Sequence, residues 1–323
     1  MTAGMLLLAA DPDAGLAAEL SRFEEEFSYP LGDGTRFRIE HGGDGWRFFH
    51  ALGEAVYAVA RADGGVQGVA GAALRRVIAP DGSAVAMVYL GDLKIAATAR
   101  GGMVLLRLAR ALQTRFEARA RAGFAVVMDG TALTPSMYTG RLGIPAFAPV
   151  AAVAILWLAT GGAAPPPAQA GSDDGIRAVA EAIGCAVFAG LAAGCYRMPD
   201  GKPGERSAMA PQWLVSADGH ACGRLEDTVR AKRLRLVSGG DMNSAHLSCF
   251  AYRTLDAGLR LLKAALSRAA QAGYPLLFVA VAPADAAGFC ARVGAQLRSC
   301  AGATVFATAA KMPGQWIINT AEI

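Results

Sequence analysis

The organisation of the chain follows from the segment Val88-Tyr89-Leu90-Gly91-Asp92-Leu93-Lys94-Ile95, which is followed by Ala96-Ala97-Thr98-Ala99-Arg100-Gly101-Gly102. The β-branched and aromatic residues of the first segment predict a strand. Apolar residues then recur at spacings of three and four from Val104 to Phe116, which predicts a helix. The Arg-Gly-Gly turn therefore places a cation and the accessible backbone of two glycines at a helix N-terminus. Unpaired N–H groups and the helix dipole favour an anion there, typically a phosphate.

The composition is that of a globular protein with a sizeable core. The chain has 323 residues, of which 54% are hydrophobic, and its net charge is only +4. The mean hydropathy is +0.32 and the pI is about 8.8. This length suffices for two ordinary domains. Because the basic residues are spread over both halves, we expect no nucleic-acid partner and favour small or acidic ligands.

The cysteines and the apolar segments indicate a cytoplasmic chain without a membrane span. All 6 cysteines lie in the second half without a Cys-x-x-Cys pair, and with 4 histidines no zinc-type spacing arises, so no metal is expected. We interpret the thiols as reduced and mostly buried. The start at Met5–Leu8 lacks a basic segment, so no signal peptide is expected. The apolar run 146–159 is shorter than the ~20 residues of a spanning helix and contains Pro149, and it predicts a buried strand.

The rest of the first half reads as an antiparallel meander followed by α/β elements. The step Asp63-Gly64 between two apolar runs predicts a hairpin. The acidic end Glu24-Glu25-Glu26 of the first predicted helix is interpreted as a solvated face. Further elements are predicted as helices at 14–27, 46–52 and 135–141 and as strands at 35–40, 55–61, 66–78, 124–128 and within 144–160.

The second half repeats the first at an offset of roughly 150 residues, about one domain length. Ala62-Asp63-Gly64 corresponds to Ala217-Asp218-Gly219, and Tyr138-Thr139-Gly140-Arg141-Leu142-Gly143 corresponds to Phe289-Cys290-Ala291-Arg292-Val293-Gly294. Two tandem copies of one α/β fold are therefore predicted. The predicted division is an N-terminal domain over 1–160, a Pro/Gly/Ala-rich linker over 161–175 and a degenerate C-terminal domain over 176–323.

This order of elements resembles the GNAT superfamily of acyl-CoA N-acyltransferases. The resemblance rests on Asp92-Leu93-Lys94-Ile95 at a strand end, on Arg100-Gly101-Gly102 at the turn, and on Tyr138 with Leu142-Gly143. It covers residues 35–160 well and residues 176–310 only through the repeat. It implies an α/β fold of two GNAT-like domains, each with a mixed, mostly antiparallel sheet flanked by helices.

The resemblance also implies an activity, a cofactor and roles for residues. The cofactor would be acetyl-CoA or another acyl-CoA, and the acyl group, most simply acetyl, would pass directly to an amine of a small molecule or peptide. Tyr138 would protonate the departing thiolate as general acid, and Asp92 would bind or deprotonate the acceptor amine. The expected cofactor-binding residues are Leu93, Lys94 and Ile95 at the pantetheine arm and Arg100, Gly101, Gly102, Met103, Val104 and Leu105 at the pyrophosphate. The family usually has small residues where Met103 and Leu105 stand.

Several alternatives remain open at this stage. Asp92 could form a structural salt bridge with Lys94 or an arginine, and Tyr138 could be a core tyrosine. The protein could be a GNAT-fold scaffold without catalysis, or it could take a longer acyl group from CoA or an acyl carrier protein. His41 and His50 are interpreted as structural or exposed.

The second copy is predicted to be non-catalytic. Phe289 replaces Tyr138, and Asp256 stands where the first copy has its phosphate turn. A monomer and a homodimer are both compatible with the sequence.

Overall fold

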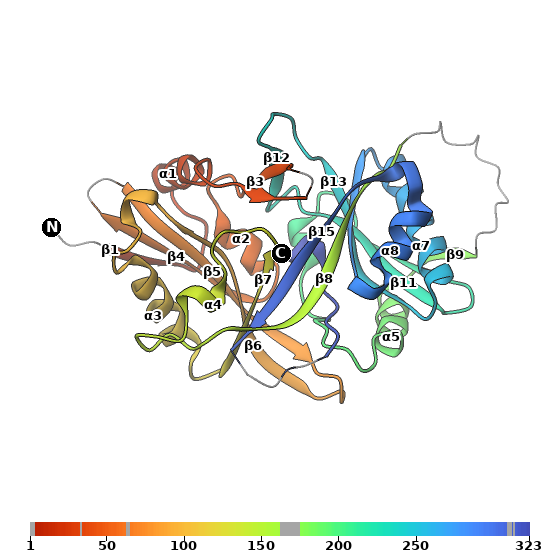
Figure 1. Ribbon diagram of the computed structural model, residues 1–323, viewed down its shortest axis with the longest axis horizontal. Helices are drawn as coiled ribbons and strands as arrows, with labels where there is room; N and C mark the ends of the chain where they lie inside the picture. The colour runs from red at the N-terminus through yellow and green to blue at the C-terminus, as the bar shows by residue number, and fades with distance from the viewer. Residues whose placement is uncertain (1–3, 33, 63–64, 162–174, 309–311, 313) are drawn as a thin grey trace.

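A computed structural model describes residues 4–32, 34–62, 65–161, 175–308, 312 and 314–323 (Figure 1). The strands of the first half are β1 (Gly4–Leu8), β2 (Tyr29–Pro30), β3 (Arg36–Glu40), β4 (Glu54–Ala62), β5 (Gly65–Ile78), β6 (Ala84–Ile95), β7 (Ala122–Met128) and β8 (Ala148–Ala159). Those of the second half are β9 (Ile176–Val179), β10 (Gln212–Ser216), β11 (Ala221–Asp227), β12 (Arg233–Leu236), β13 (Ser244–Tyr252), β14 (Leu276–Val281) and β15 (Leu297–Ala307).

The α-helices flank these strands, and three short 3-10 helices complete the described elements. The α-helices are α1 (Ala14–Glu24), α2 (Gly45–His50), α3 (Val104–Phe116), α4 (Pro135–Tyr138), α5 (Glu181–Leu191), α6 (Pro203–Arg206), α7 (Leu255–Gln271) and α8 (Pro283–Val293). The 3-10 helices are η1 (Ala97–Ala99), η2 (Gly294–Gln296) and η3 (Thr320–Glu322). The elements predicted from the sequence are all present, with ends that differ by a few residues.

Twelve strands form one continuous sheet in the order β1-β4-β5-β6-β7-β15-β8-β14-β13-β11-β10-β9. Its strand pairs are antiparallel except β6 with β7 and β13 with β14. A separate sheet has the order β12-β3-β2 and lies above the middle of the molecule (Figure 1). The predicted fold class, a mixed and mostly antiparallel α/β fold with two similar halves, is confirmed.

The two halves exchange strands at the centre of the sheet. β8 from the first half pairs with β14, and β15 from the second half pairs with β7. β8 and β15 also pair with each other over most of their lengths. The sheet therefore has no break between the halves, and the division at 160 and 176 stays a prediction. Residues 162–174 of the predicted linker lie outside the described residues.

Alternating side chains place helices on both faces of the first half. Val56, Ala58 and Ala60 of β4 pack with the apolar stripe of α3, which includes Leu108 and Leu112. The intervening Tyr57 and Val59 belong to the core that α1 and α2 cover. Successive side chains of β4 point to opposite faces of the sheet, so α3 packs on one face and α1 and α2 pack on the other. The apolar residues of a helix recur every three to four positions and therefore form one stripe that faces the sheet.

A β-bulge recurs at the same place in each half. On β6, Asp92 and Leu93 lie opposite Ala70 alone. On β13, Cys249 and Phe250 lie opposite Gly223 alone. The first residue of each bulge has a left-handed backbone, with φ of 52° at Asp92 and 51° at Cys249. The internal repeat thus extends to a local irregularity that bends the strand and increases its twist.

Two predictions about apolar and sulfur-containing residues have different outcomes. Residues 148–159 of the apolar run 146–159 form β8 as predicted, although the strand is buried only from Val153 onwards. No described helix is long and apolar enough to cross a membrane. The prediction of mostly buried thiols was wrong. The six cysteines are free, with Cys222 and Cys249 buried, three half-buried and Cys300 exposed. Cysteine is often buried, but at the half-buried and exposed positions the sequence gives no signal of the face on which it lies.

Gly71 on β5 makes room for the buried ring of Phe49, and we predict that Gly71→Ala destabilises the fold. An added Cβ would lie 2.0 Å from Cε2 of Phe49, a residue only 1% exposed. Overpacking of this kind costs about 1–3 kcal/mol. Urea denaturation should show this loss in the free energy of unfolding. The matched control is Gly190→Ala in α5, where nothing lies within 4 Å and alanine should be neutral or slightly stabilising. Equal effects of the two substitutions would contradict the packing argument.

Candidate functional site

A cavity of about 510 Å³ lies where β6 and β7 part. Their parallel pairing ends at Tyr89 and Phe124, just before the bulge at Asp92, so both strands have unpaired edges beyond that point. Leu90–Leu93 on β6 and Ala125–Met128 on β7 line the cavity. We call the opening between these two segments the notch.

The cavity has two chemically different regions. The apolar arm is lined by Leu108, Leu112 and Phe116 of α3 together with Val127 and Phe147. The polar end is lined by His41, Asp92, Lys232, His246 and Thr320. The notch thus connects a hydrophobic channel to a group of titratable side chains.

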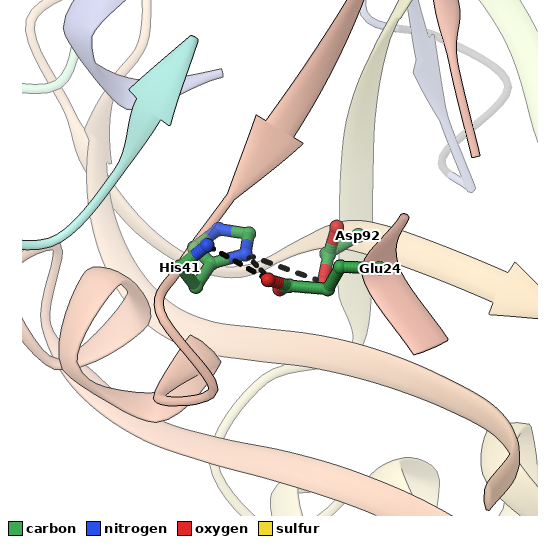
Figure 2. Close-up of side chains that lie close together, drawn as sticks. All are labelled: Glu24, His41 and Asp92. Carbon is green, nitrogen blue, oxygen red and sulfur yellow. Dashed lines mark hydrogen bonds and ion pairs between the residues drawn. The ribbon is translucent and has the colours of Figure 1, made fainter. Parts of the chain in front are cut away.

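At the polar end, Glu24 holds His41 by two contacts (Figure 2). The imidazole Nδ1 lies 2.6 Å from Oε1 of Glu24, and the backbone N–H of His41 donates to Oε2 at 2.9 Å. Glu24 is 3% exposed and His41 is 8% exposed. The interpretation of Glu24 as part of a solvated face was wrong, because the last residue of α1 turns inward towards the residue that follows β3.

Asp92 is fixed by a cation and a phenol. Lys94 Nζ lies 2.7 Å from Oδ1 in an ion pair, and the Tyr57 hydroxyl donates to Oδ2 at 2.5 Å. Burial acts to raise the pKa of Asp92, but attraction to Lys94 and the hydrogen bond from Tyr57 help to outweigh it, and that pKa lies below its ordinary value. Burial and the charges of Asp92 and Glu24 raise the pKa of Tyr57. The structure therefore contains the salt bridge that the sequence left as an alternative, and Asp92 is a weak proton acceptor.

Glu24, His41 and Asp92 also present three potential metal ligands. One ligand atom from each lies within 4.8 Å of the others. However, Lys94 Nζ already lies 2.7 Å from Asp92 and 3.8 Å from Glu24. A divalent cation would meet the ammonium group at close range, so the cluster favours the lysine as its counter-charge. The expectation that no metal is required stays a prediction.

Lys232 brings a second titratable cation to the polar end from the second half of the chain. Its Nζ donates to the backbone oxygen of Ile323 and lies 4.7 Å from the ring centre of Phe48. Burial and then the charge of Arg206 lower the pKa of Lys232 to about 7. This group therefore changes charge near neutral pH.

The structure brings four of the predicted site residues to the cavity wall. They are Asp92, Leu93, Leu105 and Tyr138. Tyr138 ends the short helix α4, and burial raises its pKa to about 12. Its phenol is therefore protonated at neutral pH.

The other predicted cofactor residues lie outside this wall. Lys94 points into the charged cluster, and Ile95 is the last residue of β6. Arg100, Gly101, Gly102 and Met103 form an exposed turn before α3, and Val104 is buried. The strand, turn and helix are thus as predicted, while the cavity runs along the side of α3.

Sequence reasoning missed several residues of the polar end. His41 was expected to be structural or exposed, and Lys232 and His246 were given no functional role. His246 is 1% exposed, and its Nδ1 lies 3.0 Å from Oγ1 of Thr320. Burial, with the charges of Lys232 and Arg206, lowers the pKa of His246 well below its usual range. No local pattern marks these residues, because partners distant in the chain define their surroundings.

The equivalent notch of the second half is filled by the chain itself. The parallel pairing of β13 and β14 ends at Leu247 and Val279. Beyond this point the backbone N–H of Cys249 donates to Oδ1 of Asn319 at 2.7 Å. The hydroxyl of Thr320 donates to the backbone oxygen of Phe278 at 3.3 Å. The bulge amide that is next to a cavity in the first half is therefore bonded to a side-chain amide in the second.

No protein-family model and no curated protein matches the sequence. Solved structures do match the fold. One is an N-myristoyltransferase of Saccharomyces cerevisiae with bound myristoyl-CoA, at 11% identity and a TM-score of 0.60, covering 94% of this chain and 78% of that chain. Another structure of that enzyme, with myristoyl-CoA and inhibitors, has 10% identity and a TM-score of 0.64, covering 98% and 84%. The chain thus shares the fold of these proteins along nearly its whole length.

The lowered pKa of Lys232 predicts that the stability of the fold depends on pH. Because the pKa is about 7 in the fold against 10.5 for an ordinary lysine, the unfolded chain binds more protons between these values. Stability relative to Lys232→Met should therefore rise with pH from about 7 to about 10, by on the order of a few kcal/mol. Urea denaturation at both ends of this range measures it. Lys263→Met on the exposed face of α7 is the control, and the same pH dependence in both variants would contradict the assignment.

Proposed function

We propose that this protein is an acyl-CoA-dependent N-acyltransferase that transfers a medium or long acyl chain to an amine of a small molecule or peptide. The observation that carries the proposal is the notch beside the Asp92 bulge, which continues into the apolar arm. The fold shared with N-myristoyltransferases crystallised with myristoyl-CoA supports it.

The notch suits the thioester end of an acyl-CoA. The unpaired edge of β6 offers backbone N–H and C=O groups to the amides of the pantetheine arm, as one strand would to another. An N–H group at the bulge would polarise the thioester carbonyl as an oxyanion donor. The exposed Arg100-Gly101-Gly102 turn offers a cation to the pyrophosphate, and the first turn of α3 that follows it would offer backbone N–H groups.

The apolar arm favours an acyl chain longer than acetyl. The whole cavity, at about 510 Å³, falls in the range of pockets that bury drug-sized ligands. The arm's wall is aliphatic and aromatic, so it contributes to binding in proportion to the apolar surface that the chain buries. A two-carbon group would leave most of this wall unused.

Tyr138 has the chemistry of a general acid. It lines the cavity and keeps its proton at neutral pH because burial raises its pKa to about 12. Asp92, held by Lys94 and Tyr57, would act by positioning its neighbours. A scaffold protein without catalysis would need neither a protonated phenol nor a continuous path from the notch to the polar end.

We predict that affinity for acyl-CoA increases with chain length until the apolar arm is full. Calorimetric titration with acetyl-, hexanoyl-, decanoyl- and myristoyl-CoA should show a gain of up to about 0.8 kcal/mol per buried methylene. Ala109→Trp, which adds bulk at the cavity wall, should weaken the long chains selectively. Thr114→Trp on the exposed side of α3 is the matched control. Arg100→Glu should weaken all four ligands alike. Equal affinity for acetyl- and decanoyl-CoA would refute the assignment of the arm.

Tyr138→Phe should separate an enzyme from a binding module. The substitution removes the acidic proton and little volume, so the rate should fall about 100-fold or more while decanoyl-CoA affinity is kept. Release of the CoA thiol with glycinamide as the amine measures the rate. An unchanged rate in Tyr138→Phe would mean that Tyr138 is a core tyrosine without a catalytic role. Wild-type protein that binds decanoyl-CoA without turnover would instead favour a scaffold protein without catalysis.

A further inference from the structure

The Glu24–His41 pair leaves one imidazole nitrogen available at the cavity. Because Nδ1 lies 2.6 Å from a carboxylate oxygen, it is the donor of this hydrogen bond, which leaves Nε2 as the acceptor nitrogen of the imidazole. Within the described residues no group hydrogen-bonds Nε2, and the ring lines the polar end of the cavity. The second contact, from the His41 backbone N–H to Glu24, fixes the position of the ring.

The ring is also close to the expected position of the thioester. His41 Nδ1 lies 3.8 Å from Oδ2 of Asp92, and Asp92 is the first residue of the bulge that borders the notch. An amine that approaches a thioester at the notch from the polar end would therefore pass the imidazole.

Other titratable side chains of the polar end already form ion pairs or hydrogen bonds with neighbouring groups. Asp92 is paired with Lys94 and Tyr57, and both oxygens of Glu24 contact His41. Lys232 donates a hydrogen bond to Ile323, so in that contact it is a donor and not a proton acceptor. His246 contacts a hydroxyl and has no carboxylate partner among the described residues, so an imidazolium there would be uncompensated.

We propose that His41, oriented by Glu24, is the group that accepts a proton from the acceptor amine. This inference rests on the acyl transfer proposed above and assigns it a base that differs from the predicted Asp92. Glu24 is a positioning residue, which keeps the proton of His41 on Nδ1 and the lone pair of Nε2 towards the cavity.

The reaction balances without a further reagent. The ammonium form of the acceptor gives one proton to Nε2 of His41, and its freed lone pair forms a C–N bond with the thioester carbonyl carbon. The C–S bond then breaks, and its electron pair leaves with sulfur. Tyr138 protonates the thiolate, and the second proton lost by nitrogen restores the phenol. The products are an amide, CoA thiol and one proton, which His41 passes to water.

Two nucleophiles with decanoyl-CoA test the proposal. Glycinamide is mostly protonated at neutral pH, since an α-amino group titrates near 8, whereas hydroxylamine is already uncharged. His41→Gln should slow transfer to glycinamide about tenfold at pH 7, because only about a tenth of an amine with a pKa near 8 is uncharged there, and it should leave transfer to hydroxylamine nearly unchanged. Glu24→Gln should also slow transfer to glycinamide more than transfer to hydroxylamine, but by a smaller factor. The matched control is His50→Gln on α2, whose side chain is 38% exposed and pairs with Glu205, and it should change neither rate.

The outcomes separate this inference from the proposed function. If His41→Gln binds decanoyl-CoA but slows both nucleophiles equally, or slows neither, His41 is structural and the inference fails while the proposed function stands. If His41→Gln does not fold, Glu24→Gln decides in the same way. Wild-type protein that transfers the acyl group to neither nucleophile would overturn the proposed function and this inference with it.

Discussion

The buried ion pair between Lys94 and Asp92 holds a residue in a conformation that most side chains avoid. A left-handed backbone at a residue other than glycine costs about 1–2 kcal/mol, and Asp92 adopts it with a φ of 52°. Its carboxylate contacts Lys94 and Tyr57 from neighbouring positions of the sheet. These contacts fix the bulge, and the bulge in turn directs β6 away from β7. The notch and the cavity behind it depend on this arrangement.

The second half uses the same bulge for a structural purpose. There the amide of Cys249 binds the side chain of Asn319, three residues before Glu322. Glu322 forms ion pairs with Arg75 of the first half and Arg206 of the second. Burial acts to raise the pKa of Glu322, but the arginines outweigh it and lower that pKa to about 2. One notch is thus bordered by a cavity, while the other anchors a segment that links both halves.

Local elements could be predicted from the sequence, whereas their long-range contacts could not. The strand ending at Ile95 and the helix from Val104 follow from hydrophobic periodicity, and the repeat follows from matched turns. The exchange of β8 and β15 could not be predicted from the sequence. Each strand is apolar, and an apolar strand sequence does not specify which neighbouring strand it pairs with. The Glu24–His41 contact joins residues 17 positions apart. Charged residues usually lie in water, so the sequence pattern favoured a solvated Glu24.

The polar end also explains why a half with a filled notch remains necessary. β12 of the second half pairs with β3 of the first, which leads into His41. Lys232 directly precedes β12 and lines the cavity together with His246 of β13. The polar end therefore takes His41 and Asp92 from the first half and Lys232, His246 and Thr320 from the second. Since neither half could enclose the titratable groups alone, strand exchange and the small sheet connect the fold of the second half to the chemistry of the first.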